Sequence, residues 1–265
     1  MVTEVITEEN RKTYMQLMKH DEILGIENDR FACFGAYDED TGEALGLITA
    51  EVYLDHIRIR RIISSPKNAE TEKALMALVT NLPEELMLPV YYYGTDEEVD
   101  ETLLLECDFT EVPSQYSYIE GTAEKLRDIG NLFRVCEVKT LDKAPLNGVQ
   151  NFIIGTKPDN LLEVPDSYLN LKRFSDASLV AVDQHRIVGI LMMEETDDLI
   201  EVPYICATGN KVTIFLFHVL RKMCIAKYGP NARLRFVIRG KLKEIAIHAL
   251  MKDGIVKKVR IFKYV

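Results

Sequence analysis

The sequence predicts an α+β protein made of two copies of one folding unit, each a twisted, mostly antiparallel sheet flanked by helices. Segments expected as strands and helices follow the same order in both halves of the chain, at a separation of 143 to 145 residues. Turn positions and spacings agree over about 75 residues of each half. The composition, with 47% hydrophobic and 28% charged residues, is that of a globular protein with a sizeable core.

The first half of the chain has the pattern of a helix, a three-strand meander, a helix, a strand, a helix and a closing strand. Thr7 is a helix-capping residue, and Gly25 ends the helical period that follows it. Polar turns separate the strand-like runs that come next. The expected ranges are 7–24 (helix), 31–37, 44–53 and 56–63 (strands), 69–82 (helix), 90–93 (strand), 98–106 (helix) and 115–119 (strand).

The second half repeats this order. Gly46 corresponds to Gly189, and Val90 corresponds to Leu234. Two copies are too few for a solenoid, so we expect tandem domains of residues 1–122 and 123–265, with a boundary near 121–131. The expected ranges are 179–182, 187–193 and 199–207 (strands), 211–228 (helix), 234–238 (strand), 242–251 (helix) and 256–264 (strand).

Charge is divided unevenly between the halves. The net charge of −10 combines −17 over residues 1–122 with +7 over residues 123–265. The basic region could hold a phosphate-bearing ligand or nucleic acid, or it could dock on the acidic half of its own chain or of a second copy. We favour docking, because the partner of opposite sign is already present; a homo-oligomer joined through these faces is the related prediction. The alternating segment 258–264 is typical of a half-buried strand, so nucleic-acid binding is not favoured.

Several functional classes find no support in the sequence. The longest apolar stretch, 212–226, is interrupted by His218, Arg221 and Lys222, which argues against a membrane span. No secretory leader is recognisable, and five widely spaced cysteines form no disulfide framework, so we expect a cytoplasmic protein with reduced thiols. The absence of His-Glu-x-x-His and Cys-x-x-Cys motifs argues against a metal site.

The order of elements resembles that of the GNAT superfamily of N-acetyltransferases, and the chain resembles a tandem pair of such domains. The resemblance implies acetyl-CoA or another acyl-CoA as co-substrate, and an amine of a small molecule or peptide as acyl acceptor. In that family the third meander strand leads into a Gln/Arg-x-x-Gly-x-Gly/Ala loop that opens the long helix. Small residues there let backbone N–H groups approach the diphosphate of the coenzyme.

The corresponding positions here depart from the family pattern. In the first half they are Ala69, Glu72 and Ala74, of which only Ala74 fits, and Glu72 would repel a diphosphate. In an ungapped alignment the second half has Val212, Phe215 and Phe217, which would block the approach of the backbone. The tyrosine that many family members use to protonate the leaving thiolate is replaced by a leucine in each half, at residues 104 and 250.

We expect any coenzyme site in the first half. Backbone N–H groups around Ile62 to Ser64 would stabilise the oxyanion, and Ser65, Lys67 and Ala74 are compatible with phosphates. The candidate general bases are Glu51, His56 and Glu201. Each of the three is also typical of a solvated or ion-paired strand residue.

The leading functional hypothesis is an acyl-CoA-dependent N-acyltransferase in which a deprotonated amine attacks the thioester directly. The alternative is a non-catalytic, degenerate GNAT-like module that senses a ligand or docks a protein through the acidic segment 96–111. Binding of acetyl-CoA distinguishes the two hypotheses.

Overall fold

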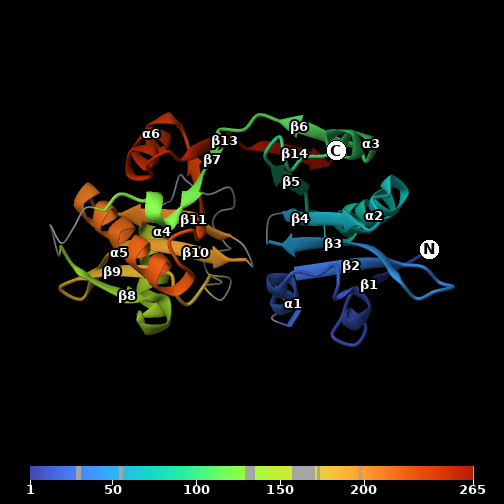
Figure 1. Ribbon diagram of the computed structural model, residues 1–265, viewed down its shortest axis with the longest axis horizontal. Coiled ribbons are helices and arrows are strands. Elements are labelled where there is room, and N and C mark those ends of the chain that lie inside the picture. The colour runs from blue at the N-terminus through green and yellow to red at the C-terminus, as the bar shows by residue number, and fades with distance from the viewer. Residues whose placement is uncertain are drawn as a thin grey trace. The chain divides into compact units, whose positions relative to one another are not determined.

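The computed structural model describes residues 1–27, 31–53, 56–86, 88–128, 135–156, 171, 174–196 and 199–264. The chain divides into two compact units (Figure 1). Unit 1 consists of Met1–Ser114 together with Val259–Val265, and unit 2 consists of Gln115–Lys258.

Unit 1 contains a seven-stranded sheet in the order β1-β2-β3-β4-β5-β14-β6. Its neighbouring strands are antiparallel except for β4 and β5, which are parallel. The strands are β1 (Val2–Val5), β2 (Phe31–Tyr37), β3 (Ala44–Val52), β4 (Ile57–Ser64), β5 (Val90–Gly94), β6 (Phe109–Val112) and β14 (Arg260–Tyr264).

Both faces of this sheet are covered, because successive side chains of a strand point to opposite sides. Ile48 of β3 faces a core that includes Leu75 and Val79 of α2 (Ala69–Leu86) and Leu104 of α3 (Glu101–Glu106). Its neighbour Leu47 faces a second core on the other side. The 3₁₀ helix η1 (Arg11–Tyr14) and the helix α1 (His20–Glu27) belong to that second side.

Unit 2 contains a second seven-stranded sheet, in the order β13-β7-β12-β11-β10-β9-β8. Again one pair is parallel, here β11 with β12. The strands are β7 (Tyr116–Thr122), β8 (Glu137–Thr140), β9 (Leu179–Asp183), β10 (Arg186–Glu195), β11 (Ile200–Ala207), β12 (Arg233–Arg239) and β13 (Ile255–Lys258).

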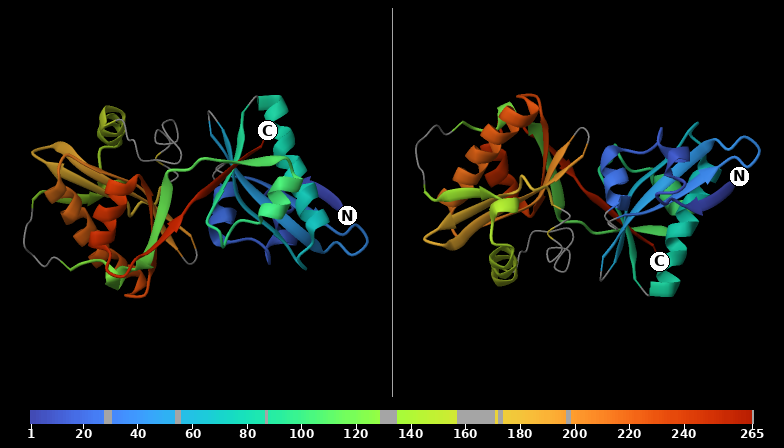
Figure 2. Two further views of the ribbon diagram at one scale, coloured as in Figure 1. Left: turned by 90° about the horizontal axis from the view of Figure 1, so that it is seen from above. Right: turned by 90° about the horizontal axis from the view of Figure 1, so that it is seen from below.

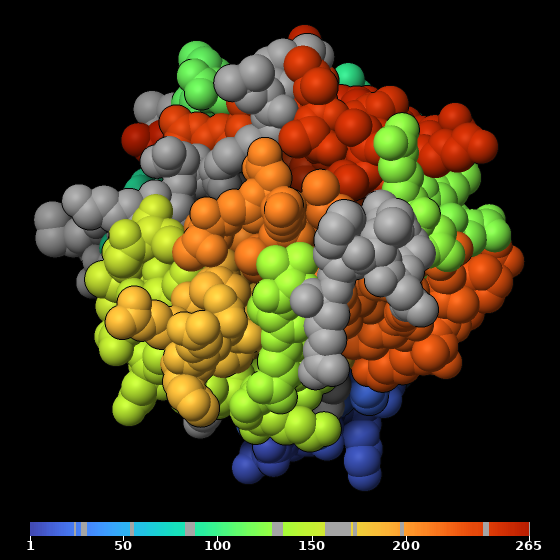
Figure 3. Space-filling view, turned by 90° about the vertical axis from the view of Figure 1, so that its left-hand side faces the viewer, coloured from blue at the N-terminus to red at the C-terminus, as the bar shows by residue number. Residues whose placement is uncertain are grey.

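The helices of unit 2 follow the same two-sided arrangement. The long helix α5 (Asn210–Tyr228) and α6 (Lys241–Leu250) pack on the side that Leu191 faces, while α4 (Leu146–Thr156) packs on the side of Ile190. Two short 3₁₀ helices, η2 (Ala123–Lys125) and η3 (Leu141–Lys143), lie before α4. Figure 3 looks onto this unit, whose residues are coloured from green through orange to red.

One strand of each sheet comes from the opposite half of the chain. Strand β7 directly follows β6 in sequence but pairs with β12 and β13 in unit 2. Strand β14 directly follows β13 but pairs with β5 and β6 in unit 1. Figure 2 shows the red end of the chain leaving unit 2 and entering the sheet of unit 1. The two units therefore exchange equivalent strands.

This exchange changes the domain boundaries expected from the sequence. The division into residues 1–122 and 123–265 assigns each exchanged strand to the wrong sheet, since units are built from 1–114 with 259–265 and from 115–258. The single strand expected over 256–264 is two strands, β13 and β14, in different sheets. The helix expected over 7–24 is also not continuous: it is replaced by η1 and the shorter α1.

The predicted fold class is confirmed, because each unit is a mostly antiparallel sheet flanked by helices.

The exchanged strand β14 also brings a positive charge into the acidic half of the sequence. Arg260 of β14 contacts Glu111 at 2.7 Å, Glu101 at 3.0 Å and Asp96 at 3.7 Å. Arg260, a basic residue of the second half of the sequence, thus pairs with acidic residues of the first half.

Candidate functional site

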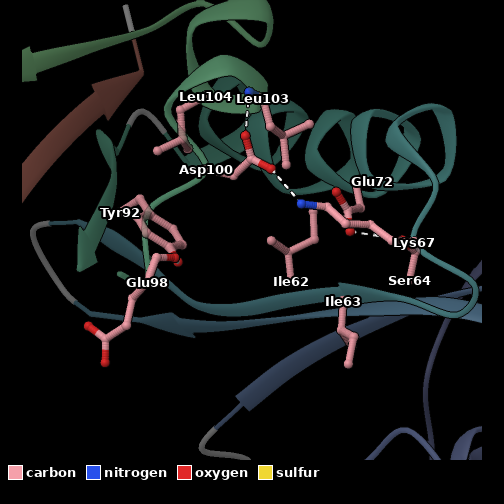
Figure 4. Close-up of a pocket in the computed structure, with 10 residues that line it drawn as sticks. All are labelled: Ile62, Ile63, Ser64, Lys67, Glu72, Tyr92, Glu98, Asp100, Leu103 and Leu104. Atoms are coloured by element: carbon pink, nitrogen blue, oxygen red, sulfur yellow. Dashed lines mark hydrogen bonds and ion pairs between the residues drawn. The ribbon is translucent and has the colours of Figure 1, made fainter. Parts of the chain in front are cut away.

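Strands β4 and β5 of unit 1 separate after a short parallel ladder. The ladder joins Ile57, Arg58 and Ile59 to Val90, Tyr91 and Tyr92, and β4 then continues to Ser64 without this partner. A pocket of about 270 Å³ opens beside this divergence (Figure 4). Its lining residues are Ile62, Ile63, Ser64, Lys67, Glu72, Tyr92, Glu98, Asp100, Leu103 and Leu104.

An ion pair lies at the exposed side of this pocket. The Lys67 ammonium is 2.9 Å from Asp100 Oδ2, and the Leu103 N–H donates to the other carboxylate oxygen. These contacts, with Lys67 first, lower the pKa of the Asp100 carboxyl. The same pair raises the pKa of Lys67, mainly through its hydrogen bond to Asp100. Both groups are therefore charged at neutral pH.

A buried carboxylate lies on the inner side of the pocket. Ser64 Oγ donates to Glu72 Oε1 at 2.8 Å and accepts the Asn68 N–H at 2.7 Å. The Asn68 side chain caps α2 by accepting the N–H groups of Glu70 and Thr71 at 2.9 and 3.2 Å. An Asn at this position satisfies amides that a bound anion would otherwise use. The N-terminus of α2 is therefore already supplied with acceptors.

Gly46 and Gly189, which correspond in sequence, show which residues of the two long helices correspond. A Cβ atom on Gly46 would lie 3.1 Å from Thr71 and 3.2 Å from Leu75 of α2. A Cβ atom on Gly189 would lie 2.9 Å from Val212 and 3.1 Å from Leu216 of α5. Glycine lets the helix approach the sheet closely at both places. Each residue of α5 thus has the number of its counterpart in α2 plus 141.

The N-terminus of α5 carries different groups. Its cap residue is Gly209, no side chain caps the helix, and its first turn contains no acidic residue. No atom lies within 4 Å of a Cβ built on Gly209, so the space there is open. In this alignment Lys211 and Thr213 stand where α2 has Glu70 and Glu72. An open, uncapped helix N-terminus beside a lysine favours an anion.

The ungapped alignment of the sequence placed two phenylalanines at this N-terminus, and the structure corrects it. Helix α5 begins at Asn210, so Phe215 and Phe217 lie in its second turn. Phe217 is 3% exposed and packs against Phe236 with ring centroids 5.1 Å apart. Neither ring belongs to the first turn of the helix, where the N–H groups of Val212 and Thr213 donate to the backbone oxygen of Gly209 at 3.0 and 3.2 Å.

The five residues predicted to hold a coenzyme are only partly brought together. Ile62, Ser64 and Lys67 line the pocket of unit 1. Ser65 is exposed, and its N–H donates to Leu45 O at 2.8 Å. Ala74 is half-buried on α2 and is not among the lining residues. The assignment of a coenzyme to these residues stays a prediction.

Two of the three candidate bases lie near each other in unit 1. Glu51 is buried on β3 and accepts the Tyr53 hydroxyl at 2.7 Å, while Arg60 lies 3.6 Å away. His56 stacks on the Tyr53 ring with centroids 4.5 Å apart and meets the edge of Tyr91. The close hydrogen bond and stacking contacts give both residues a packing role, whatever their part in chemistry.

Glu201, the third candidate base, belongs to unit 2. It is 8% exposed on β11, and its carboxylate lies 3.8 Å from Arg235. In the ladder between β11 and β12 these two residues are direct partners. The equivalent partners in unit 1 are Arg58 and Tyr91, so the two units carry different charges at matching places.

Sequence reasoning missed Asn68, Tyr92 and Asp100. Asn68 and Asp100 immediately precede helices and accept backbone N–H groups of the first turn, so their type and position are the usual capping signal. Tyr92 lies in the aromatic run 91–93, and aromatic strand residues more often pack in a core than line a site; its hydroxyl donates to Glu98 O at 3.0 Å. The two leucines noted at the position of the family tyrosine also differ in setting, since Leu104 lines the pocket and is 2% exposed.

Two features are absent from the part of the chain that the structure describes. In that part of the chain, none of the helices combines the length and apolar character that crossing a membrane requires. The same residues include no group of three or more His, Cys, Asp or Glu placed to hold a metal ion. All five cysteines are free. Burial raises the pKa of the Cys33 and Cys224 thiols to about 12, which keeps both protonated at neutral pH.

Comparison with known proteins identifies the fold. No protein-family model matches the sequence, and no curated protein sequence matches it. Among solved structures, a tandem GNAT protein from the clavulanic acid biosynthesis pathway aligns over 100% of this chain and 98% of its own, with a TM-score of 0.70 and 8% identity. A GNAT-family acetyltransferase from Colwellia psychrerythraea aligns over the whole of both chains (TM-score 0.58, 9% identity).

A third similar structure is a GCN5-related N-acetyltransferase from Kribbella flavida, with a TM-score of 0.56 and 13% identity over 98% of this chain and 70% of that one. At such low identities the likeness concerns the fold. Two matching seven-stranded units, the parallel pair in each sheet and these similarities lead to one conclusion: the chain has the tandem GNAT fold.

Proposed function

We propose that this protein is an acyl-CoA-dependent N-acyltransferase whose coenzyme site lies in unit 2. The observation that carries the proposal is the N-terminus of α5, which has a glycine cap, open space and no acidic residue in its first turn. It follows β11, which separates from β12 after the pair Val202 and Phe236 and continues to Ala207. Backbone N–H groups at a helix N-terminus suit a diphosphate.

The contacts of unit 1 fit the coenzyme less well. There the Asn68 side chain already caps two amides, and the buried Glu72 carboxylate lies near the start of the same helix. A second negative group brought to this position would be repelled. This charge arrangement favours unit 2 over the first-half site expected from the sequence.

In the proposed mechanism, the acceptor amine would attack the acyl carbon of the acyl-CoA thioester. The C–N bond would form as the C–S bond breaks, and coenzyme A would leave as a thiolate that takes up a proton. The thioester would lie along β11 between Ile205 and Ala207, beyond its ladder with β12, where backbone N–H groups would hold the developing oxyanion. Lys211 at the start of α5 would offset phosphate charge. Glu201 is the candidate base for the amine proton, and Glu201→Gln tests it by lowering kcat more than it raises KM.

Binding of coenzyme A tests the site directly. Gly209→Asp adds a helix-capping carboxylate where the diphosphate would bind. It should leave the stability equal or higher by a few tenths of a kcal/mol, yet weaken binding of coenzyme A at least tenfold, equivalent to about 1.4 kcal/mol. Isothermal titration calorimetry measures the affinity and thermal unfolding measures the stability. Asn68→Asp makes the matching change in unit 1 and should leave the affinity as it is.

A loss of affinity in Asn68→Asp, with Gly209→Asp unaffected, would move the coenzyme to unit 1. If the unaltered protein binds neither acetyl-CoA nor coenzyme A, the acyltransferase proposal fails. The second candidate function, a non-catalytic ligand-binding module, is favoured by Glu72 in the pocket of unit 1 and by Leu104 where the family has a tyrosine.

A further inference from the structure

The pocket of unit 1 contains a carboxylate that is buried yet incompletely paired. Glu72 is 6% exposed, and Ser64 Oγ donates to its Oε1. Within the described part of the chain, Oε2 receives no hydrogen bond. Placing a carboxylate in a poorly solvated site is costly unless another group supplies a positive charge or hydrogen-bond donors. The pocket therefore offers a strong acceptor to a ligand.

The charged neighbours of Glu72 do not remove this demand. The charge of Glu72 acts on Lys67, but the hydrogen bond of Lys67 goes to Asp100 at 2.9 Å, and Asp100 rather than Glu72 is its ion-pair partner. Figure 4 shows the Lys67 ammonium directed at Asp100, the residue that caps α3, and it shows the Glu98 carboxylate pointing away from the other lining residues. Glu98 Oε2 accepts the Thr95 N–H. The inner pocket thus has one negative charge in excess.

The rest of the pocket wall is mostly apolar. Ile62 comes from β4, Tyr92 from β5, and Leu103 and Leu104 from α3. The Tyr92 hydroxyl is engaged with Glu98 O, and burial raises its pKa to about 12, so the ring is neutral. A volume of about 270 Å³ is at the small end of ligand sites.

We propose that this pocket is a binding site for a small organic monocation, with an ammonium group held by Glu72 and a compact apolar body held by Ile62, Tyr92 and Leu104. The site binds its ligand without a covalent step, since Ser64, Lys67 and Tyr92 are all engaged in hydrogen bonds. It is distinct from the coenzyme site proposed in unit 2 and does not depend on it.

A matched ligand series tests the charge requirement. Hexylammonium, hexanol and hexanoate share the apolar chain and differ in their polar group. Titration calorimetry and thermal unfolding of the full chain at constant pH and salt should show binding of hexylammonium that is at least tenfold tighter than that of hexanol. Equal affinity for the ammonium and the alcohol, or tighter binding of hexanoate, overturns the proposal.

Two variants then place the binding. Glu72→Gln keeps the shape and a hydrogen-bond acceptor but removes the charge, and it should weaken hexylammonium binding at least tenfold. Glu70→Gln, an exposed carboxylate two residues away, is the charge-matched control and should retain the affinity. Unchanged binding in Glu72→Gln rejects the site.

Pocket size gives a second test that leaves Glu72 in place. Ile62 is only half-buried, so Ile62→Phe should fill part of the pocket while the protein folds. The variant should weaken the binding of hexylammonium more than that of ethylammonium. A uniform effect on both ligands, or none, contradicts the proposed position of the apolar body. Gly209→Asp should change neither titration, which separates this site from the coenzyme site.

Discussion

Helix α2 begins after Asn68, whose side chain caps two amides, whereas its counterpart α5 begins after Gly209, which has no side chain to offer. The following turn carries Glu70 and Glu72 in unit 1 but Lys211 and Thr213 in unit 2. The long helix nevertheless lies at the same place on both sheets, because Gly46 faces Thr71 and Leu75, and Gly189 faces the corresponding Val212 and Leu216.

The comparison separates the residues that position the long helix on its sheet from the residues that set the charge at its N-terminus. Close packing of glycine against the long helix is preserved in both units, although charge at the start of that helix has changed sign. One fold thus presents an anion-repelling pocket in unit 1 and an anion-attracting helix end in unit 2. We propose that the two copies bind different ligands, although their element order is the same.

The largest expected difference between the units concerns continuity of the chain. Unit 2 is one segment, 115–258, and should unfold cooperatively when made alone. Residues 1–114 alone should not, because β14 supplies Phe262, which is fully buried in the core, and the hydrogen-bond partners of β5 and β6. Urea denaturation followed by circular dichroism measures the cooperativity of unfolding of the two fragments, 115–258 and 1–114.

A fusion provides the control for this prediction. Val112 of β6 lies opposite Ile261 of the antiparallel β14, so a short turn can connect Ser114 to Val259. Residues 1–114 joined in this way to 259–265 should regain cooperative unfolding. Equal cooperativity with and without the added strand would contradict the role assigned to β14.

A smaller difference should appear at the matched glycines. Gly46→Ala places a Cβ 2.7 Å from the backbone oxygen of Ile63, whereas Gly189→Ala places it 2.9 Å from a methyl group of Val212. Overpacking of this kind typically costs about 1–3 kcal/mol. We expect the greater loss of unfolding free energy in Gly46→Ala, since a backbone atom cannot rotate away. Chemical denaturation of the two variants of the full chain gives the order, and a larger loss in Gly189→Ala would contradict it.

The smallest expected difference is a pH dependence confined to unit 2. His218 of α5 is 4% exposed, while its counterpart in α2 is Ala77. Burial, followed by the charge of Lys222, lowers the pKa of His218; Arg221 acts in the same direction and Asp128 opposes them. The unfolded state then binds a proton first as the pH falls through about 6.5, so the stability due to this residue is lost towards acid pH.

Denaturation between pH 8 and pH 5 measures this effect. For a single proton the slope is at most about 1.4 kcal/mol per pH unit. His218→Leu should flatten the loss of stability below pH 6.5, and His248→Leu, a change at an exposed histidine of α6, serves as the control. A pH profile that is the same in His218→Leu and in the original protein would remove His218 as its source.

Most of the repeated unit could be predicted from periodicity and turns. The match of Gly46 with Gly189 and of Val90 with Leu234 is confirmed by equal positions in the two sheets. Residues 7–24 were harder, because a helical period does not show that the chain turns between η1 and α1. The small strands β1 and β8 also lack a clear alternating pattern.

The site was less accessible to sequence reasoning. Alternation over 256–264 predicts extended backbone, but hydrophobic pattern does not specify the sheet in which a strand pairs. An ungapped alignment likewise could not reveal that α5 is displaced by two residues relative to the meander, which assigned Phe215 and Phe217 to the wrong turn. Sequence analysis found Ile62, Ser64 and Lys67 because the end of a strand and the start of a helix can be recognised from sequence. It could not predict the charge balance around Glu72, which depends on side-chain contacts across three elements.

The exchange of strands also determines when each unit can be completed during synthesis of the protein. Strand β6 leaves the ribosome about 150 residues before β14. At roughly 5–20 residues per second, this interval lasts roughly 7–30 s. During that time the partly made unit 1 has two unpaired strand edges, on β5 and β6, which are open to pairing with other chains. Unit 2 needs no such wait once β13 has emerged, so the half of the protein made first is the half completed last.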